Sequence, residues 1–513
     1  MSGATILSPA ATTTISLSEI PYNLEVPGVY YQVTPNYSDA GLLPFPAKAL
    51  LIGAFTGTAT MDGNVPYPVF SESQAQNLAG AGSPLAQMAA AFIKANPWTP
   101  VDIIGIPVSS YGHSAGQISI SGTATATGTL ALYIMGVRVA TPVSQGDSAS
   151  TVAGNIGTAL QALTLQPGAI PFSSGSLPFA YYVTNAALYL APNALGVLGN
   201  GLDIRLNAGP GEQTPAGLSV TITPFAGATE PYDITAALDA VANSWYTDIV
   251  CGFNDSANVA AFEAALAARY VANEKLDARG YRCVTGTPGT VQAAQAGLNS
   301  PFCTTLAMNN PMQPSWVIAA SFAGACSYQL AQDPSRQLRG VPLPGIIAPA
   351  VADRYSLTDR QILLASGLST TTVAVDGSVQ LERVVTENTT DANGVPTEAW
   401  HDIMVPATLS RIRYDWIAYV SLIYPRNKLA PDGSMAAEYD PTVVTPKRMR
   451  GTWAARCRVY AENGWIVNVA QTVQASTFVI DANNPNRMNA RQQIQLIGNL
   501  IILAGDLEFA AVA

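Results

Sequence analysis

The hydrophobic pattern of residues 112–230 is that of a β-rich domain. Four segments alternate between apolar and polar residues, or run apolar, between Gly and Pro residues: 117–136, 179–192, 201–209 and 217–227. One helix interrupts them behind Ser150 and Thr151, which can cap its start, because four apolar residues recur at helical spacing: Val152, Ile156, Leu160 and Leu163. We therefore expect an inserted domain built mainly of strands.

From residue 231 onward, short apolar strands alternate with helices. The strands are expected at 247–253, 280–286 and 302–308. The helices are expected to begin at Asp255, with Val259, Phe262 and Leu266 on its apolar stripe, at Thr290, and at Ser315. The last of these runs to about Ala331 and is apolar nearly all round, so it should be buried between layers. This alternation predicts a sheet with helices on its faces.

The C-terminal part is predicted to hold a hairpin, two amphipathic helices and further strands. Asp376-Gly377 between alternating runs marks the hairpin. Apolar positions mark the first helix: Leu409, Ile412, Trp416, Tyr419 and Ile423. The second is opened by Thr445-Pro446, carries Met449, Trp453 and Tyr460 on its apolar face, and ends at Gly464. Strands are expected at 465–471 and 475–481.

Both ends of the chain are predicted to be extended. Residues 12–33 have the pattern of strands, with nothing before them to pair with, and Leu507–Val512 forms a closing ribbon. A strand without a partner in its own chain is either an aggregation hazard or a connector to another molecule.

Charged residues are scarce and unevenly placed. They make up 11% of the 513 residues, where about 25% is typical of soluble proteins. The longest apolar runs, 316–326 and 494–504, fall short of the roughly 18 residues that a membrane span needs. The net charge of -10 argues against a chain that binds a polyphosphate backbone. Nevertheless, basic residues crowd the stretch from Arg411 to Arg458.

The sequence also bears on compartment. The first basic residue is Lys48, so a secretory signal is not expected. Five cysteines are odd in number and mostly lie in apolar runs, which favours buried free thiols in a reducing cytoplasm.

The residues needed for common catalytic chemistry are missing. The chain has only two histidines, His113 and His401, and both are interpreted as surface or hinge residues. No nucleophile elbow, dinucleotide, phosphate-loop or zinc motif occurs, and "GAGSPLAQM" is interpreted as a helix start at Ser83 with Pro84 in its first turn. The polar run 387–398 is interpreted as a turn rather than a calcium loop. Arg411 and Asp415 are expected to pair across one helical turn. We therefore expect no catalytic site, cofactor or metal.

Several segments in a fixed order resemble the tail sheath proteins of contractile-tailed bacteriophages, in the Mu-like branch. They include "ISLSEIPYNLEVPGVY", "ALLIGAFTGTA", "GAGSPLAQMAAAFIKANP", "ISGTATATGTLALYIMG", "DPSRQLRGVPLPGI", "LLASGLSTTTVAVDGSVQLERVVT" and "NPNRMNARQQIQLIGNLIILAGDLEF". After "NPNR" the sequence departs from the family pattern, which often has an Asp, a Pro pair and an Asp-Leu-Val there, whereas this chain has Asn489, Gln492–Gln495 and Leu496. The resemblance covers nearly the whole chain.

The resemblance implies a multi-domain α+β fold whose α/β core has a subtilisin-like layer without a catalytic triad. The domains implied are an N-terminal arm (1–20), the first part of the core (21–111), an outward-facing β-rich domain (112–230), the subtilisin-like core (231–385), a tube-facing α+β domain (386–505) and a C-terminal arm strand (506–513). The arms of such proteins add as strands to neighbouring subunits. Apolar residues of the arms would supply the adhesion: Ile15, Leu17, Ile20, Leu507, Phe509 and Val512.

The function implied is that of a self-assembling subunit of a contractile sheath. It would form stacked hexameric rings around a tail tube, contact baseplate and tail terminator proteins at the ends, and drive the tube through the host envelope on contraction. It would assemble in the bacterial host cytoplasm and reside in the virion tail, with no nucleic-acid partner and no membrane insertion. Candidate basic residues for the tube contact are Lys447, Arg448, Arg450, Arg487 and Arg491.

Alternatives remain at this level. The basic residues also fit a solvated helix face paired with Glu462 and its neighbours. A static shell or adhesin whose β-rich domain does the binding would differ from a sheath in having a single lattice height. A hydrolase on the subtilisin-like layer would require an essential Ser or His.

Overall fold

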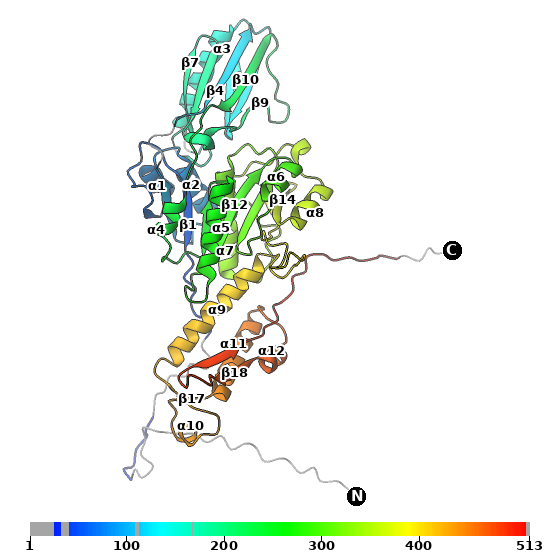
Figure 1. Ribbon diagram of the computed structural model, residues 1–513. Coiled ribbons are helices and arrows are strands. Elements are labelled where there is room, and N and C mark those ends of the chain that lie inside the picture. The colour runs from blue at the N-terminus through cyan, green and yellow to red at the C-terminus, as the bar shows by residue number, and fades with distance from the viewer. Residues whose placement is uncertain (1–24, 32–40, 108–111, 167, 174, 509–513) are drawn as a thin grey trace, which may run out of the picture.

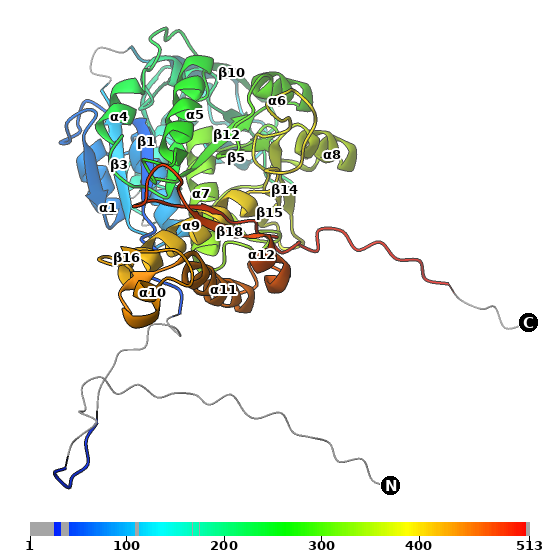
Figure 2. The same cartoon turned by 60° about the horizontal axis from the view of Figure 1, so that its bottom comes forward.

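The computed structural model describes residues 25–31, 41–107, 112–166, 168–173 and 175–508. These residues form three tiers, shown from top to bottom in Figure 1: a β-rich domain, an α/β sheet with its helices, and a block around a long inclined helix. Figure 2 shows that the described C-terminal segment leaves this body as an extended chain. The predicted mixed α/β fold with several domains is confirmed at this level. The likeness of one layer to subtilisin, and the domain boundaries themselves, stay predictions.

The middle tier is an eight-stranded sheet in the order β15-β14-β13-β12-β11-β1-β3-β2. Its strands are β1 (Ala49–Ala54), β2 (Pro66–Val69), β3 (Val101–Ile106), β11 (Asp248–Cys251), β12 (Arg279–Thr285), β13 (Cys303–Met308), β14 (Leu368–Val373) and β15 (Val379–Arg383). The six inner strands are parallel, and β2 and β15 are antiparallel edges. Because helices cover both faces, every residue of β1, β3 and β13 is buried.

Successive residues of β1 face two different helix layers, as the period of two in a strand requires. Ala49 and Leu51 pack in the cluster that holds α2 (Pro84–Ala95) and α7 (Ser315–Gln332). Leu50 and Ile52 pack in the cluster that holds α4 (Thr235–Ala240) and α5 (Ser256–Tyr270). The remaining elements of this tier are α1 (Glu72–Ala79), α6 (Pro288–Gln295), the 3-10 turn η2 (Val351–Asp353) and α8 (Leu357–Ala365). The strand and helix alternation predicted from residue 231 is confirmed.

Helix starts follow side-chain caps. Asp255 caps α5 as predicted, since its carboxylate accepts from the backbone N–H of Asn258. Ser83 caps α2 with Pro84 in the first turn, also as predicted. The start predicted at Thr290 is wrong, because Thr287 caps α6 and places Thr290 inside its first turn. Ser148, rather than Ser150 or Thr151, caps α3 (Ala149–Thr164), since it is the residue with extended backbone before the helix.

The top tier contains a four-stranded sheet, β10-β4-β8-β7, and a three-stranded sheet, β6-β5-β9. Their strands are β4 (Ala115–Gly122), β5 (Gly128–Ile134), β6 (Val137–Val143), β7 (Phe179–Thr184), β8 (Ala187–Pro192), β9 (Ile204–Leu206) and β10 (Leu218–Ala226), with a 3-10 turn η1 at Gly196–Gly199. Strand β6 was not predicted. It pairs with β5 through a turn in which Met135 and Gly136 both have positive φ, the geometry that a two-residue hairpin needs.

The bottom block holds the C-terminal elements. They are α9 (Met404–Ile423), β16 (Lys428–Leu429), α10 (Met435–Tyr439), β17 (Val443–Val444), α11 (Pro446–Glu462), α12 (Val469–Ala475), β18 (Thr477–Ile480) and β19 (Met488–Arg491). The hairpin at Asp376-Gly377, both amphipathic helices and the strand near residue 478 are confirmed.

The strand predicted at 465–471 is wrong. Trp465 and Ile466 fold onto the apolar cluster of the bottom block, and Asn468 turns the chain with φ 54° into helix α12. The apolar run therefore serves as an anchor before a helix. In the described part of the chain, no helix has both the length and the apolar character to cross a membrane.

Candidate assembly surface: the roots of the two arms

The predicted arm residues lie mostly beyond what the structure describes. Ile15, Leu17, Ile20, Phe509 and Val512 fall outside the described residues. Leu507 is described and is 95% exposed, in no strand of this chain. The addition of the arms to neighbouring subunits therefore stays a prediction.

The described end of the chain, residues 498–508, presents apolar side chains to solvent, and we call it the C-terminal arm from here on, although it begins before the arm predicted at 506–513. Leu500, Ile502 and Leu503 are between 74% and 84% exposed, and Leu507 more so. Figures 1 and 2 agree that this segment extends away from all three tiers. Contiguous exposed apolar residues at this density mark an interaction surface in a soluble protein.

The C-terminal arm is rooted on the bottom block. The backbone N–H of Ile497 donates to the Trp465 carbonyl at 3.1 Å, and that of Val467 donates to the Gln495 carbonyl at 2.9 Å. Ile494 and Leu496 pack on the apolar cluster around Trp453 and Trp465. The arm is thus fixed up to about residue 497 and projects beyond it.

The segment 41–45 roots the N-terminal side on the same block. Arg411 on α9 donates to the Leu43 carbonyl at 3.4 Å, and Tyr414 donates to the Pro44 carbonyl at 2.9 Å. The Phe45 ring lies edge-on to Tyr414 and also to Trp245, from the loop before β11.

A buried ion pair completes this root. Asp415 on α9 and Arg456 on α11 are each 1% exposed, and Arg456 Nη2 lies 2.5 Å from Asp415 Oδ2. The same oxygen accepts from the Tyr460 hydroxyl at 2.8 Å. The other oxygen, Oδ1, accepts from the Leu43 N–H at 3.1 Å. The predicted pairing of Asp415 with Arg411 is therefore wrong, because the carboxylate turns inward to Arg456.

Strands β18 and β19 form an isolated antiparallel pair in the bottom block. Within the described residues no third strand lies against either edge. A two-stranded ribbon is only marginally stable in water, and its outer edges carry unpaired backbone groups. Open strand edges are the kind of surface that an added strand can extend.

The five basic residues proposed for the tube contact differ in the hydrogen bonds that their charged groups form within this chain. Arg448 donates to the Pro441 and Val443 carbonyls, and Arg450 donates to the Val473 and Gln474 carbonyls, which closes the C-terminal end of α12. These two guanidinium groups therefore support the block itself.

Arg487 donates to the Asn489 side chain at 2.7 Å. In the described part of the chain, no hydrogen bond or ion pair holds the charged groups of Lys447 or Arg491, and both residues are exposed. Lys447 and Arg491 are the candidates freest to meet a partner. No ion pair with Glu462 forms among the described residues, and whether these residues contact a tube or form a solvated face stays a prediction.

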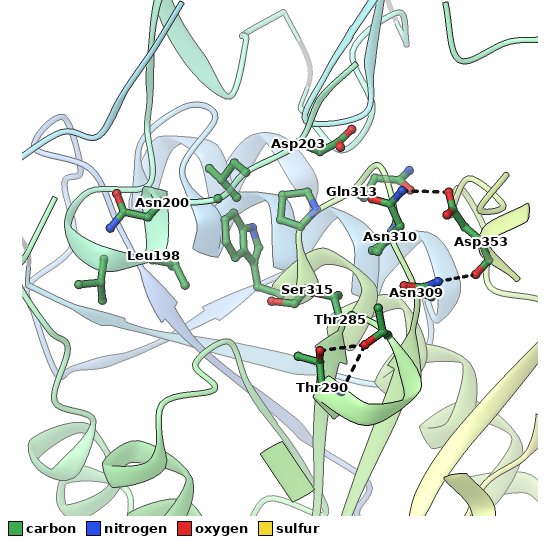
Figure 3. Close-up of a pocket in the computed structure, with 18 residues that line it drawn as sticks. Leu198, Asn200, Asp203, Thr285, Thr290, Asn309, Asn310, Gln313, Ser315 and Asp353 are labelled. Atoms are coloured by element: carbon green, nitrogen blue, oxygen red, sulfur yellow. Dashed lines mark hydrogen bonds between the residues drawn. The ribbon is translucent and has the colours of Figure 1, made fainter. Parts of the chain in front are cut away.

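One cavity lies between the top and middle tiers, with a volume of about 670 Å³. Figure 3 shows its lining at the carboxyl ends of β12 and β13, with Thr290, Asn310 and Asp353 on the core side and Asp203 on the β-rich domain. Several polar groups here are paired. Asn310 donates to the Asp353 carboxylate at 2.9 Å, and Asp203 Oδ1 pairs with Arg205 at 2.7 Å, while Asp203 Oδ2 has no hydrogen-bond partner among the described residues. The cavity is thus a seam between tiers.

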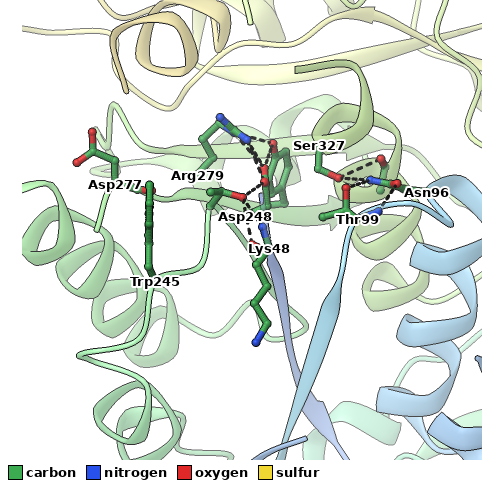
Figure 4. A network of polar contacts seen from close by, with 11 residues as sticks. Lys48, Asn96, Thr99, Trp245, Asp248, Asp277, Arg279 and Ser327 are labelled. Atoms are coloured by element: carbon green, nitrogen blue, oxygen red, sulfur yellow. Dashed lines mark hydrogen bonds and ion pairs between the residues drawn. The ribbon is translucent and has the colours of Figure 1, made fainter. Parts of the chain in front are cut away.

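A polar network at the opposite, amino ends of the strands is structural (Figure 4). Arg279 and Asp248 form a buried pair at 2.8 Å, and the Thr247 hydroxyl donates to the same carboxylate. Thr247 also accepts from the Lys48 N–H, so the network ties the start of β1 to β11 and β12. Among the described residues no group of three or more acidic, His or Cys side chains could hold a metal ion.

A second buried group lies between α5 and the sheet. Arg282 Nη2 donates to Glu387 at 2.6 Å, and the Thr305 hydroxyl donates to the same oxygen at 2.6 Å. Burial is the main reason that the pKa of Glu263 is raised well above its usual range. A hydrogen bond to Glu387 and the negative charge of that carboxylate raise the pKa further. Burial alone would raise the pKa of Glu387. The positive charge of Arg282 and the hydrogen bonds from Glu263, Thr305 and Arg282 outweigh burial, so the pKa of Glu387 is lowered.

The remaining titratable candidates are not catalytic. His113 is exposed, as predicted, but the prediction for His401 is wrong, since it is 8% exposed. Burial, reinforced by the charge of Arg383, lowers the pKa of His401. All five cysteines are free and buried, as predicted, and burial raises the pKa of Cys251 to about 11.

Comparison with known proteins gives a relative along the whole chain. It is the Mu-like prophage FluMu tail sheath protein of Haemophilus influenzae, 29% identical over 497 residues, which cover 96% of this chain and 99% of the relative. The chain is thus similar along nearly its whole length to this Mu-like tail sheath protein. The resemblance predicted from the sequence motifs is thereby confirmed, as is the prediction of a structural protein that is not an enzyme. No protein-family model matches the chain.

Solved structures of sheath proteins are also similar. The sheath tail protein Lin1278 from Listeria innocua is 12% identical, with a TM-score of 0.48 over 90% of this chain and 94% of that chain. The helical sheath of the anti-feeding prophage in its contracted state is 11% identical, with a TM-score of 0.47 over 95% of this chain and 99% of that chain.

Proposed function

We propose that this chain is the subunit of a contractile tail sheath that polymerises into stacked hexameric rings by adding its arms, as strands, to neighbouring copies. The full-length relationship to a tail sheath protein supports the sheath assignment. The observation that carries the arm exchange is the exposed apolar segment 500–507, which is rooted firmly at residue 497 and projects from the body.

The open ribbon β18–β19 is the acceptor in this proposal. An arm strand that pairs with it gains backbone hydrogen bonds of about 1 kcal/mol each. Each Leu or Ile that becomes buried adds about 1.5–3 kcal/mol. Leu500, Ile502, Leu503 and Leu507 therefore supply most of the adhesion, with the N-terminal residues Ile15, Leu17 and Ile20 acting likewise at the other contact.

Such exchange is a heterologous contact, in which different surfaces of each copy meet. Heterologous contacts close into rings or propagate as helices. Extended arm segments between fixed roots let the bodies rotate and slide while they stay linked, so that two lattices can interconvert without dissociation. The extended lattice would be held kinetically until contraction is triggered.

The tail tube is the proposed partner of the bottom block. Exposed basic residues there suit an acidic tube surface, where many weak contacts along a lattice hold together and release together. Lys447 and Arg491 are the leading contact residues, because Arg448, Arg450 and Arg487 have partners in their own chain. Baseplate and tail terminator proteins would bind the ends of the sheath, which assembles in the host cytoplasm and resides in the tail.

The test is assembly of truncated chains, followed by electron microscopy. Deletion of residues 507–513, or of 1–20, should leave folded subunits that form no tubes. A matched control replaces Leu507 by Ile, which retains the apolar area, and should assemble normally. Normal tubes from either truncation would refute the arm exchange, and a single lattice height under all conditions would favour a static shell.

A further inference from the structure

Both arms enter the subunit through one apolar cluster. Leu42 on the N-terminal side and Leu496 on the C-terminal side pack with Trp453, Tyr460 and Trp465 in the bottom block. The two roots belong to opposite ends of the sequence, yet α9 and α11 hold both of them. Both roots therefore contact the body through these two helices.

The ion pair at the centre of this cluster is directed at the N-terminal root. Asp415 uses one oxygen for Arg456 and Tyr460 and keeps the other for the Leu43 N–H. Arg456 in turn extends Nη1 to the Gly41 carbonyl at 3.3 Å. One buried pair thus holds a backbone donor and a backbone acceptor two residues apart, which fixes the direction of the chain where the root begins.

Stability alone does not explain this arrangement. A buried ion pair is generally no more stabilising than apolar residues of the same volume, because desolvation offsets the attraction. The pair instead fixes the position of the backbone at residues 41 and 43. Asp415 accepts a hydrogen bond from the Leu43 N–H, and Arg456 donates one to the Gly41 carbonyl.

Arg411 connects the two roots. Its guanidinium lies 4.6 Å from the centre of the Phe45 ring and 5.9 Å from that of Trp465, and it donates to the Leu43 carbonyl. Trp465 is the residue whose carbonyl anchors Ile497 at the C-terminal root. A single side chain on α9 therefore touches the N-terminal root and the anchor of the C-terminal root.

We propose that Asp415, Arg456 and Arg411 form a joint that sets the directions in which both arms leave the subunit and transmits load between the arms through α9 and α11. They are positioning residues, which act on neighbouring copies only through the arms. The proposal rests on the proposed arm exchange. It predicts that load passes between neighbouring copies without crossing the eight-stranded sheet.

The closing experiment measures hydrogen exchange of the unassembled full-length chain by mass spectrometry. Asp415→Asn should raise the exchange rate of peptides covering 41–47 by about tenfold, as expected for loss of a charge-assisted hydrogen bond. Peptides from β1 and α7 should not change. A matched control is Asp277→Asn, which removes the 2.9 Å pair between Asp277 and Arg413 on the same helix but contacts neither root.

A second variant keeps the test decisive if Asp415→Asn does not fold. Arg411→Leu retains an apolar group against Phe45 but removes the bond to Leu43, and should raise exchange in 41–47 and in 496–501 together. Unchanged exchange in both segments, with tubes of normal order from these variants, would overturn the joint. A different result would separate the two proposals. If hydrogen exchange increases in the unassembled variants but arm-truncated chains still assemble normally, then the addition of arms to neighbouring copies is refuted, whereas the contacts at the roots are confirmed.

Discussion

Replacement of Glu263 by Gln should stabilise the protein at alkaline pH and remove one component of its pH dependence. The pKa of Glu263 is raised by burial first and by the neighbouring Glu387 second, so the folded chain holds a proton there that the unfolded chain releases. Where the folded state binds more protons, stability falls as pH rises. The loss begins at the ordinary pKa of a glutamic acid and continues upward through the raised one. Gln mimics the protonated form at every pH.

The size of the effect follows from the linkage slope. One extra proton in the folded state changes the free energy of unfolding by about 1.4 kcal/mol per pH unit, so the span from about pH 5 to about pH 8 could contribute up to about 4 kcal/mol. Glu263 is half-buried, and solvent screening reduces this to about 2 kcal/mol. The assay is the thermal unfolding midpoint of both proteins across this span. The difference between them should be near zero at the acidic end and grow with pH.

The matched variant is Glu387→Gln, which neutralises the other carboxylate. Glu387 is fully buried and paired with Arg282, so its neutralisation leaves an uncompensated buried cation and should cost about 3–5 kcal/mol at neutral pH. Two variants of the same chemistry should thus act in opposite directions. If Glu263→Gln destabilises the protein as much as Glu387→Gln, or if its difference from the parent does not vary with pH, then the assignment of the proton to Glu263 is wrong.

Two further outcomes are expected. Charge reversal at Lys447 and Arg491 should weaken assembly on a tail tube without changing the unfolding midpoint, whereas Arg450→Glu should lower the midpoint because its guanidinium closes α12; equal tail yields would exclude the first pair from the tube contact. Cys251 should resist alkylation near neutral pH until the chain is denatured, since burial raises its pKa and shields it; rapid reaction of the native chain would show that the layer over it opens.

Hydrophobic periodicity was sufficient to predict the elements whose burial is regular. Helix α7 is apolar nearly all round, as suits a helix that is covered on most sides. Strands β11 and β13 are short and mostly apolar or uncharged, as suits strands with helices on both faces of the sheet. The hairpin at Asp376-Gly377 was predictable since its turn residues favour one geometry. In each case local pattern and tertiary environment agree.

The sequence was a poorer guide where long-range contacts decide. Trp465 and Ile466 look like the start of a strand, but the pocket they fill is made by α9 and α11, so the chain turns there into a helix. Asp415 lies one turn from Arg411 yet pairs with Arg456 at a separation of 41 residues. Arg448 and Arg450 donate to the backbone carbonyls of residues 441, 443 and 473. Only the folded chain brings these carbonyls near the two arginines, so the sequence alone did not predict these partners. The spacing of residues along a helix predicts which side chains are neighbours on that helix. It does not predict which distant backbone or side-chain groups will form hydrogen bonds with those side chains instead.

The small number of charged residues can be related to where the ion pairs of the subunit lie. Ten ion pairs form among the described residues, and several are almost fully buried inside the subunit, as are Arg279–Asp248, Arg282–Glu387 and Arg456–Asp415. The ten pairs use 10 of the 24 basic and 10 of the 34 acidic residues, so the low charge of the outside follows mainly from the small number of charged residues in the chain. A surface pair between subunits would have to break whenever the bodies slide, at a cost that grows where the pair is buried. Weakly charged bodies that are joined by apolar arms avoid this barrier. On the proposed function, the low charge content is therefore what lets one set of arm contacts persist while the contacts between bodies are exchanged.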